Sequence, residues 1–449
     1  MEKVDCVRRF GSNCFLLTLI LGLATLARVA ALVVWQDDLQ RDPNGYLDVA
    51  YGLVAGDGFV NSTTNQPTAA RPPLYPVLLS IVVRLGGGPT SIGVLQLVLG
   101  VATVWLVYLL GKQLGTSQSE TSQLGTSLPG ASRVGLVAAG VVAVDPLLLK
   151  YTAAVMTETL FVFLTACLLL SIARCAESPT DRRRQAFVGA LFGLAALCRP
   201  TFWAFGMLWL AVELVRMTVS TERRERFHLL RLPWAGLLAA GLVVSPWVVR
   251  NVRVFDRPIV TTTHGGQTLL WGNNPVFYRE VVTKSPATIW SAKSHADWQA
   301  GIDRRMLAET PPVVSETDRD RWLYAEAWST IRQEPRMFLQ SCSVRFARFW
   351  SPVPMGSVGS SLPHAVWYMV GLFYIVMFGG CLVGVWSLRG VGFERVQPLL
   401  ILIAAFTCVH LVYWSNVRMR APLMPALAVL FAFGLLWASA RGQETLPSE

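Results

Sequence analysis

The residues with the clearest chemical potential follow directly after the first long apolar stretch. Asp42 precedes a proline, Tyr46 lies four residues further on, and Arg71 precedes a Pro-Pro pair. Because proline fixes its own backbone and restricts the residue before it, Asp42 and Arg71 are held on rigid backbone. A carboxylate held in this way can take a proton from an attacking hydroxyl group, as a general base does. Residue type alone makes Asp42 one candidate base among the aspartates of this loop.

A set of arginines stands at the ends of apolar stretches, outside the clearly basic loops. The set comprises Arg71, Arg199, Arg250, Arg253, Arg418 and Arg420. Since Lys and Arg are depleted on the outer side of membrane proteins, these residues need another reason there. A guanidinium group donates two parallel hydrogen bonds to a phosphate, so we predict a phosphate site centred on Arg418 and Arg420. Snorkelling to the interface and pairing with acidic neighbours are the alternatives.

Two carboxylates interrupt apolar sequence further along the chain. Asp145 stands before a proline, Glu158 opens the next apolar stretch, and Lys150 lies between them. Carboxylates at membrane depth are costly and are usually functional, so we predict that Asp145 and Glu158 lie near each other and bind substrate. A helix cap or an ion pair with Lys150 is the structural alternative.

The segment from 246 to 275 combines tryptophan, asparagine and glycine. It contains Arg250 and the run WGNNP, which includes Asn273 and Asn274. A tryptophan can stack on a sugar ring and an asparagine can hydrogen-bond its hydroxyl groups, so this segment is a candidate sugar or headgroup surface. A tryptophan at the membrane interface next to ordinary turns explains the same residues equally well.

Composition indicates that these residues belong to a membrane protein. The 449 residues are 53% hydrophobic and only 15% charged, whereas about a quarter of the residues of a soluble protein are charged. The net charge of +11 comes from arginines in short loops between apolar stretches, which excludes a nucleic-acid-binding stripe. The cysteine spacing predicts neither a disulfide framework nor a metal site, and whether a divalent cation takes part is left open.

The elements that must position these residues are about ten transmembrane helices. A helix needs about 20 apolar residues to cross a bilayer, and basic loops stay in the cytoplasm. The 72–85 stretch is shorter and begins with Pro-Pro, so we place it along the outer interface, which leaves every basic loop and both termini inside. The predicted spans are 14–35, 91–111, 133–150, 153–173, 186–199, 201–218, 233–249, 366–388, 397–415 and 421–440.

Two regions lie outside in this topology. The first is the loop 36–90, in which Tyr46–Val54 is predicted to form a short helix. The second runs from 250 to 365 and contains two amphipathic patterns, Asp318–Gln333 and Arg336–Trp350, that predict helices. The chain therefore divides into a membrane domain with a catalytic loop (1–249), an external segment (250–365) and C-terminal membrane helices (366–449).

In their order and their side of the membrane, these motifs resemble one known family. The chain resembles the GT-C fold glycosyltransferases that use polyprenyl-phosphate sugars, the group of the protein O-mannosyltransferases and the lipid A aminoarabinose transferase. The resemblance covers about 14–440. Its motifs are Asp42…Tyr46, Arg71-Pro72-Pro73-Leu74, Met156-Thr157-Glu158, Cys198-Arg199-Pro200, Pro246-Trp247…Arg250-Asn251, Gly272-Asn273-Asn274-Pro275 and Arg418…Arg420-Ala421-Pro422.

The resemblance implies an all-α polytopic enzyme that performs an inverting sugar transfer at the outer face of the cell (inner) membrane. Asp42 would deprotonate the acceptor hydroxyl of a protein, lipid or polysaccharide. Arg418 and Arg420 would stabilise the phosphate of the leaving lipid carrier. Tyr46, Arg71 and the other residues named above would line the substrate cavity.

One departure from the family pattern leaves alternatives open. Many relatives have Asp-Glu where this chain has Asp42-Pro43, so Asp37 and Asp38 compete for the role of base. An oligosaccharide ligase or polymerase that uses a lipid-pyrophosphate glycan needs similar arginines. A transporter is the alternative from another class, although the chain lacks the internal repeats that many transporters show.

Overall fold

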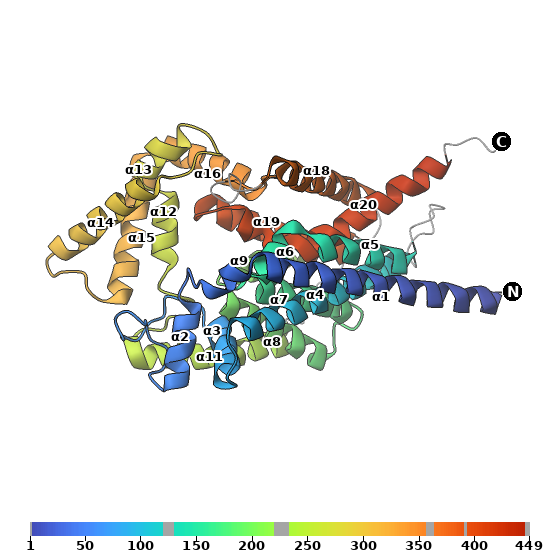
Figure 1. Ribbon diagram of the computed structural model, residues 1–449, viewed down its shortest axis with the longest axis horizontal. Coiled ribbons are helices and arrows are strands. Elements are labelled where there is room, and N and C mark those ends of the chain that lie inside the picture. Colours follow the sequence, from blue (N-terminus) through green and yellow to red (C-terminus); the bar gives the residue numbers. More distant parts are fainter. Residues whose placement is uncertain (1, 120–129, 220–232, 356–362, 390–392, 445–449) are drawn as a thin grey trace.

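The chain forms a bundle of long helices with a helical extension at one end, as the computed structural model shows (Figure 1). The structure describes residues 2–119, 130–219, 233–355, 363–389 and 393–444. Within these ranges the regular secondary structure is helical, and β-structure is limited to the isolated bridge between Val60 and Pro67. The run QLGTS occurs twice, at 113–117 and at 123–127; the first copy belongs to α4, and the second copy and the basic cluster Arg223–Arg226 lie outside the described residues.

The helices follow one another in the order numbered in Figure 1. They are α1 (Glu2–Val34), η1 (Gln36–Gln40), α2 (Tyr46–Ala55), α3 (Leu74–Arg84), α4 (Pro89–Ser119), α5 (Ala131–Val144), α6 (Pro146–Thr152), α7 (Glu158–Ala176), α8 (Arg182–Cys198), α9 (Phe202–Val219), α11 (Trp234–Phe255), α12 (Gly265–Gly272), α13 (Pro275–Phe277), η2 (Tyr278–Val282), α14 (Ala292–Ala308), α15 (Glu316–Gln333), α16 (Pro335–Phe349), α18 (His364–Ser387), α19 (Phe393–Val412), η3 (Val417–Leu423) and α20 (Met424–Glu444).

Each predicted span overlaps helical residues, although 133–150 is divided between α5 and α6 at Asp145, and the count of ten is not confirmed. Among the described residues, six helices are long and apolar enough to cross a membrane, or seven if the bent pair α5 and α6 forms one span. Helix α8, for example, is shorter and less apolar than these six. The all-helical, polytopic fold class is confirmed.

The long helices pack through glycines where two backbones approach each other. Helices α4 and α5, α8 and α11, and α18 and α20 form the most extensive contacts. A Cβ atom at Gly189 would collide with the backbone of Gly236, and one at Gly384 would collide with that of Leu430. Small residues allow this close approach in membranes, where van der Waals packing replaces the hydrophobic effect between helices.

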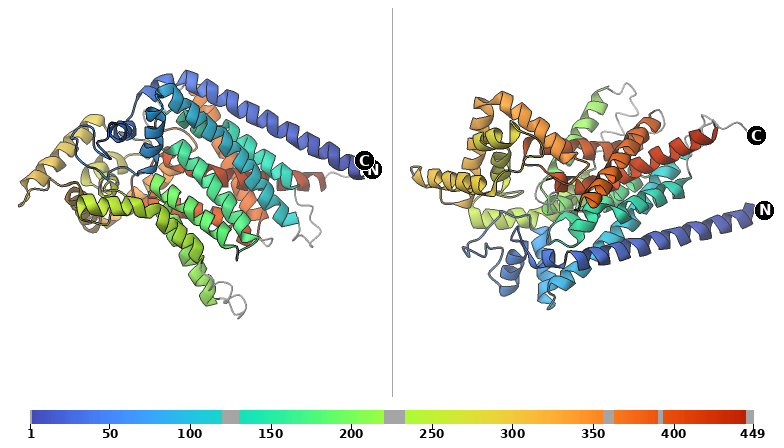
Figure 2. Two further views of the ribbon diagram at one scale, coloured as in Figure 1. Left: turned by 90° about the horizontal axis from the view of Figure 1, so that it is seen from below. Right: turned by 45° about the horizontal axis from the view of Figure 1, so that its top comes forward.

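The two ends of the bundle differ in what they carry. Both termini lie at one end, and α12 to α16 form the extension at the other end (Figures 1 and 2). The short helices α2 and α3 lie near that second end and run across the direction of α1, as an interfacial element would (Figure 1). Helices α2, α15 and α16 occupy the segments that were predicted to be helical outside the spans.

The external segment is attached to the first loop through one carboxylate. Glu316, at the start of α15, accepts hydrogen bonds from the Thr68 hydroxyl (2.6 Å), from the Ala69 backbone N–H (2.7 Å) and from the Thr263 hydroxyl. On the other side of the loop, Arg250 donates to the carbonyls of Thr68 and Phe59, each at 2.8 Å. The loop that leads to Arg71 is therefore held from both sides.

Candidate active site

A buried carboxylate between two arginines forms the centre of the candidate site. Glu158 begins α7 and is 1% exposed. Its Oε1 lies 3.4 Å from Nη1 of Arg199 and 3.2 Å from Nε of Arg418. Both Glu158 oxygens lack a hydrogen-bond partner, so these two contacts are ion pairs without hydrogen-bond geometry. The positive end of the α7 dipole lies at this position and attracts acidic side chains.

Local backbone explains why these two arginines reach Glu158. Pro200 disfavours the helical conformation at Arg199, which is extended (φ −149°, ψ 126°) and ends α8. Arg418 lies in η3, which Asn416 caps by accepting a hydrogen bond from the Arg418 N–H at 3.0 Å. The side chains of Arg199 and Arg418 donate hydrogen bonds to the thioether sulfurs of Met419 and Met156, respectively, which are weak acceptors. A phosphate could replace such partners at small cost.

Arg420 lies in the same turn but points elsewhere. A 3₁₀ helix has three residues per turn, so residues two apart face different directions. Arg420 is 1% exposed and donates to the carbonyls of Phe349 and Ser351, each at 2.9 Å. Its guanidinium also lies 4.5 Å from the centre of the Tyr374 ring. The structure thus places Arg418 beside Glu158, and Arg420 against α16 and α18.

Asp145 lies in the neighbourhood of Arg420 and Tyr374. It is fully buried between α5 and α6, accepts from the Leu148 N–H (2.9 Å) as an N-cap, and accepts from the Tyr374 hydroxyl (3.1 Å). The capping alternative raised from the sequence describes this contact. Lys150 pairs with Asp38 and not with Asp145 or Glu158.

The first loop brings its aspartate to the same region as the arginines. One oxygen of Asp42, Oδ2, accepts from the N–H groups of Leu47 (2.6 Å) and Asp48 (3.3 Å) at the start of α2. The other, Oδ1, is buried without a hydrogen-bond partner. A buried lone pair without a donor is unfavourable, so it is available for an incoming hydroxyl group.

Tyr46 and Tyr75 connect Asp42 to the charge cluster. Their rings meet edge to face at 5.3 Å, and Arg71 lies over the Tyr46 ring at 5.9 Å. Burial raises the pKa of Tyr46, while the charges of Arg199, Arg71 and Arg418 oppose that rise. Burial also raises the pKa of Tyr75, and the charges of Glu158 and Asp42 add to it. Both hydroxyl groups therefore lie within the electrostatic reach of the predicted site residues and stay protonated.

The alternative bases of the first loop have other environments. Asp38 is paired with Lys150 and lies 3.7 Å from Arg41. Asp37 is exposed, and Asp48 is exposed and accepts from the Ser62 hydroxyl at 3.0 Å. Among these carboxylates, Asp42 is the one with a buried oxygen that lacks a partner.

Comparison with known proteins connects this geometry to a fold family. Residues 70–249 match the sequence profile of the family described as dolichyl-phosphate-mannose-protein mannosyltransferase. The archaeal oligosaccharyltransferase AglB from Archaeoglobus fulgidus, in complex with an inhibitory peptide and a dolichol-phosphate, is 14% identical with a TM-score of 0.52. The apo form of the Archaeoglobus fulgidus enzyme is 13% identical with a TM-score of 0.54; both alignments cover 96% of this chain. The fold is that of the GT-C glycosyltransferases.

The GT-C match has a limited extent in sequence and in length. This chain spans about half of the archaeal enzyme, since the alignments cover 52% of it. ArnT from Cupriavidus metallidurans bound to undecaprenyl phosphate is 14% identical over 94% of this chain and 78% of its own, with a TM-score of 0.41. No curated protein matches the chain. The GT-C resemblance predicted from the sequence is confirmed at the level of the fold and, over 70–249, of the sequence pattern.

Three further residues predicted to bind substrate in this GT-C fold hold backbone instead. Arg250 donates hydrogen bonds to the backbone carbonyls of Thr68 and Phe59 in the first loop. The Asn273 amide donates to the carbonyls of Leu269 (2.7 Å) and Val412 (2.8 Å). The Asn274 amide donates to Leu270 at 2.9 Å, and its oxygen accepts from the Phe277 N–H at 2.8 Å. In this conformation these side chains position the external segment, and their role in binding stays a prediction.

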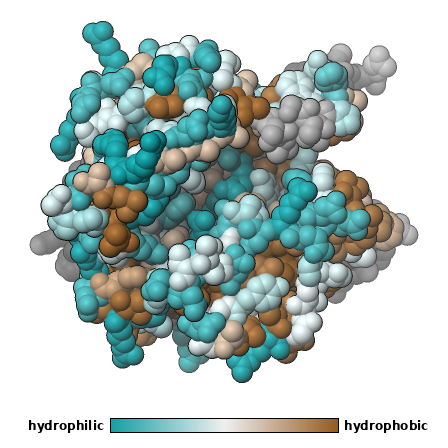
Figure 3. All heavy atoms as spheres, turned by 60° about the vertical axis from the view of Figure 1, so that its left-hand side comes forward, coloured by the Kyte–Doolittle hydropathy of each residue, from teal (hydrophilic) through white to brown (hydrophobic). Residues whose placement is uncertain are grey.

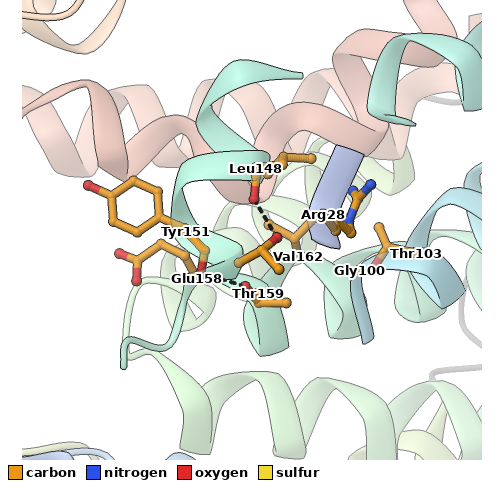
Figure 4. Close-up of a pocket in the computed structure, with 9 residues that line it drawn as sticks. Arg28, Gly100, Thr103, Leu148, Tyr151, Glu158, Thr159 and Val162 are labelled. Carbon is orange, nitrogen blue, oxygen red and sulfur yellow. Dashed lines mark hydrogen bonds between the residues drawn. The ribbon is translucent and has the colours of Figure 1, made fainter. Parts of the chain in front are cut away.

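Sequence reasoning missed Arg28 in the first transmembrane helix. Arg28 is 1% exposed and donates to the carbonyls of Ala143 (3.2 Å) and Val142 (3.3 Å) at the end of α5. Its side chain fits because Gly100 on α4 has no Cβ atom. Arg28, Tyr151 and Glu158 line one narrow cavity that is large enough for about one water molecule, with Arg28 at one side of it and Tyr151 and Glu158 at the other (Figure 4). The signal available in the sequence was an arginine inside an otherwise apolar stretch.

The external segment adds polar groups to the surroundings of the first loop. Seen from the external end, the surface is mainly hydrophilic and is hollowed between the upper lobe and the lower lobe (Figure 3). His264, in the external segment, is close enough to Arg71 for their charges to interact. Burial lowers the pKa of His264 to about 3, so it is neutral at physiological pH. Among the described residues, no group of three or more His, Cys, Asp or Glu is arranged to hold a metal ion.

Proposed function

We propose that this protein is a membrane glycosyltransferase that moves a sugar from a polyprenyl-phosphate carrier to an acceptor hydroxyl at the outer membrane face. The observation that carries the proposal is the Arg199–Glu158–Arg418 cluster next to the first loop and its Asp42. The GT-C fold and the dolichol-phosphate bound to the archaeal relative support a lipid-linked phosphate as the donor.

The charge of the cluster suits a phosphate that carries a single negative charge. Two guanidinium groups and one carboxylate leave one net positive charge, which matches the one negative charge of a phosphodiester-linked sugar. When the sugar leaves, the carrier becomes a phosphate monoester with additional negative charge. Arg199 and Arg418 then stabilise the leaving group more strongly than the ground state, which is the condition for catalysis.

Asp42 acts as the general base in this proposal. The acceptor oxygen forms a bond to the anomeric carbon, the bond from that carbon to the phosphate oxygen breaks, and the acceptor proton moves to Oδ1 of Asp42. Attack comes from the face opposite the phosphate, so the configuration is inverted. The hydrogen bonds from Leu47 and Asp48 to Oδ2 hold the carboxylate in place during the transfer.

An oligosaccharide ligase with a pyrophosphate-linked glycan is the second candidate. The fold shared with the archaeal oligosaccharyltransferase favours it. A pyrophosphate carries at least one more negative charge and so requires another cation. Arg71, which lies over the Tyr46 ring, is a candidate for this cation. We favour the monophosphate donor because Arg71 already donates to the carbonyl of Asn44 at 2.7 Å.

The test measures release of polyprenyl phosphate by protein in lipid nanodiscs, with radiolabelled polyprenyl-phosphate sugars and with membrane extract as a source of acceptors. Loss of a general base lowers turnover by about 10²- to 10⁴-fold in Asp42→Asn. Loss of one fixed cationic donor lowers it by about 10²- to 10³-fold in Arg418→Ala. Asp48→Asn is the matched control, because this aspartate is exposed and lies at the start of α2, directly after the loop that holds Asp42.

The results separate the candidates. Normal turnover by Asp42→Asn would assign the base elsewhere, with Asp37 and Asp38 next. Turnover with pyrophosphate-linked glycans alone would replace the monophosphate proposal by the ligase.

A further inference from the structure

A basic groove lies at the end of the bundle opposite the candidate active site. It has a volume of about 390 Å³ and is lined by Ser171, Arg174, Arg183, Arg184 and Phe187. These residues belong to the end of α7 and the start of α8. Glu158 begins α7, and a helix of 19 residues rises about 28 Å. The groove is therefore separate from the proposed transfer site and has no part in it.

The carboxylates around the groove are already engaged. Asp181 caps α8 by accepting from the N–H groups of Arg183 (2.9 Å) and Arg184 (3.3 Å), and it lies 3.4 Å from the Arg184 guanidinium. Glu177 lies 4.0 Å from Arg184 and also accepts from Gln113 of α4. Arg184 further donates to the carbonyl of Arg174 at 2.7 Å, which caps α7. These contacts hold the turn between α7 and α8, and the charge of Arg184 is balanced by Asp181 and Glu177 within it.

Two arginines in the groove keep their charge unbalanced. Arg174 and Arg183 are exposed and form no ion pair within the described part of the chain. Arg183 also lies in the first turn of α8, where the positive end of the helix dipole disfavours a cation. An anion between Arg174 and Arg183 would relieve both the mutual repulsion and the unfavourable dipole interaction.

The surroundings of the groove indicate where this anion comes from. Phe187 follows Arg183 by one turn on the same face of α8 and is 59% exposed. An exposed phenylalanine on a helix of the bundle contacts lipid tails, so the groove opens where headgroups lie. Basic pockets between membrane helices are typical sites for anionic headgroups. We propose that this groove binds the headgroup of an anionic phospholipid of the surrounding membrane, with Arg174 and Arg183 on its phosphate and Phe187 against its acyl chain.

The test compares binding of phosphatidylglycerol and phosphatidylcholine to the purified full chain by native mass spectrometry. The variant Arg174→Gln/Arg183→Gln removes the two unbalanced charges of the groove. Arg133→Gln/Arg182→Gln removes two exposed charges from the same end of the bundle, outside the groove. We expect phosphatidylglycerol to bind the wild type and the Arg133/Arg182 variant alike, and the Arg174/Arg183 variant at least tenfold more weakly.

Three outcomes would overturn the proposal. Equal loss in both double variants would assign the effect to diffuse surface charge. Equal binding of phosphatidylcholine and phosphatidylglycerol would exclude an anionic site, and displacement by millimolar inorganic phosphate would make it a site for the free ion. The variant Arg174→Lys/Arg183→Lys, which keeps the charge, should retain binding and controls for misfolding. Because the readout is lipid binding, its result does not depend on whether the protein transfers sugar.

Discussion

At the scale of the residue, five buried or half-buried arginines of this protein fall into two groups. Arg28, Arg345 and Arg420 donate to backbone carbonyls and so brace helix ends. Arg199 and Arg418 instead share one carboxylate, and their side-chain hydrogen bonds go to thioether sulfurs. A guanidinium whose donors are used by carbonyls is committed to the fold. A guanidinium group that faces a single carboxylate can still donate hydrogen bonds to a phosphate.

This difference predicts a ranking of stability around Glu158. Glu158→Gln leaves two arginines without their counterion, whereas Arg199→Met leaves Glu158 paired with Arg418. Removing one partner from a buried ion pair costs about 3–5 kcal/mol. We expect Glu158→Gln to lower the free energy of unfolding by about that amount and Arg199→Met to lower it by clearly less. Unfolding measured in detergent would contradict the arrangement if Arg199→Met were the more damaging change.

At the scale of the element, the breaks between helices carry the chemistry. Glu158 follows the break after α6, Arg199 lies between α8 and α9, and Arg418 lies in η3 before α20. Non-helical backbone at membrane depth is tolerated where it lines a cavity. Three helices are interrupted near the same end of the bundle. At these breaks Glu158, Arg199 and Arg418, which are far apart in the sequence, come together in one cluster.

The uninterrupted parts of the helices depend on close packing, which a pair of glycines in α18 can test. A Cβ atom at Gly384 would collide with the carbonyl of Leu430 in α20, whereas one at Gly379 would meet nothing within 4 Å. We expect Gly384→Ala to destabilise the protein by about 1–3 kcal/mol, as overpacking does. Gly379→Ala should leave its thermal stability unchanged or raise it by up to about 1 kcal/mol. Equal effects in a thermal unfolding assay would refute the close backbone contact between α18 and α20.

The attachment of α15 to the first loop makes a prediction for hydrogen exchange. Glu316→Ala removes the carboxylate that accepts from the Ala69 N–H and from two threonine hydroxyl groups. Hydrogen bonds to a charged group contribute about 1.5–3 kcal/mol each. Protection of the Ala69 amide should therefore fall by at least about tenfold. Glu309→Ala, which removes a hydrogen bond to Trp322 within the external segment, should leave that amide unchanged; loss of protection in both variants would indicate general loosening.

At the scale of the whole molecule, the two ends of the bundle carry different features. One end carries the candidate active site and the external helices, and the other carries both termini and the basic groove (Figures 1 and 2). This polarity agrees with the distribution of arginines, which keeps basic loops in the cytoplasm. Sugar transfer and lipid binding are therefore proposed for opposite faces of the membrane.

Cysteine labelling of intact cells tests this orientation. In a background without native cysteines, Ala300→Cys in α14 should react with a membrane-impermeant maleimide. Thr180→Cys, in the turn between α7 and α8, should react only after the membrane is permeabilised, because it lies at the opposite end. Both positions are exposed, so access depends on the membrane alone. Labelling of Thr180→Cys in intact cells would reverse the proposed topology.

The sequence by itself determined the helical membrane class, the short helix at Tyr46 and the two amphipathic helices of the external segment. These depend on apolar length and on periodicity, which are local properties of the chain. It also singled out Asp42, Glu158, Arg199 and Arg418, because a charge inside or beside an apolar stretch is costly wherever the chain folds.

Only the tertiary structure decided which charges meet. Arg418 and Arg420 look equivalent in sequence, yet the turn of η3 directs one to Glu158 and the other to backbone carbonyls. Arg28 and Glu316 went unnoticed because their partners, α5 and the first loop, lie more than 100 residues away. Whether a polar group braces the fold or faces a cavity depends on the acceptors around it, and packing between distant segments supplies those acceptors.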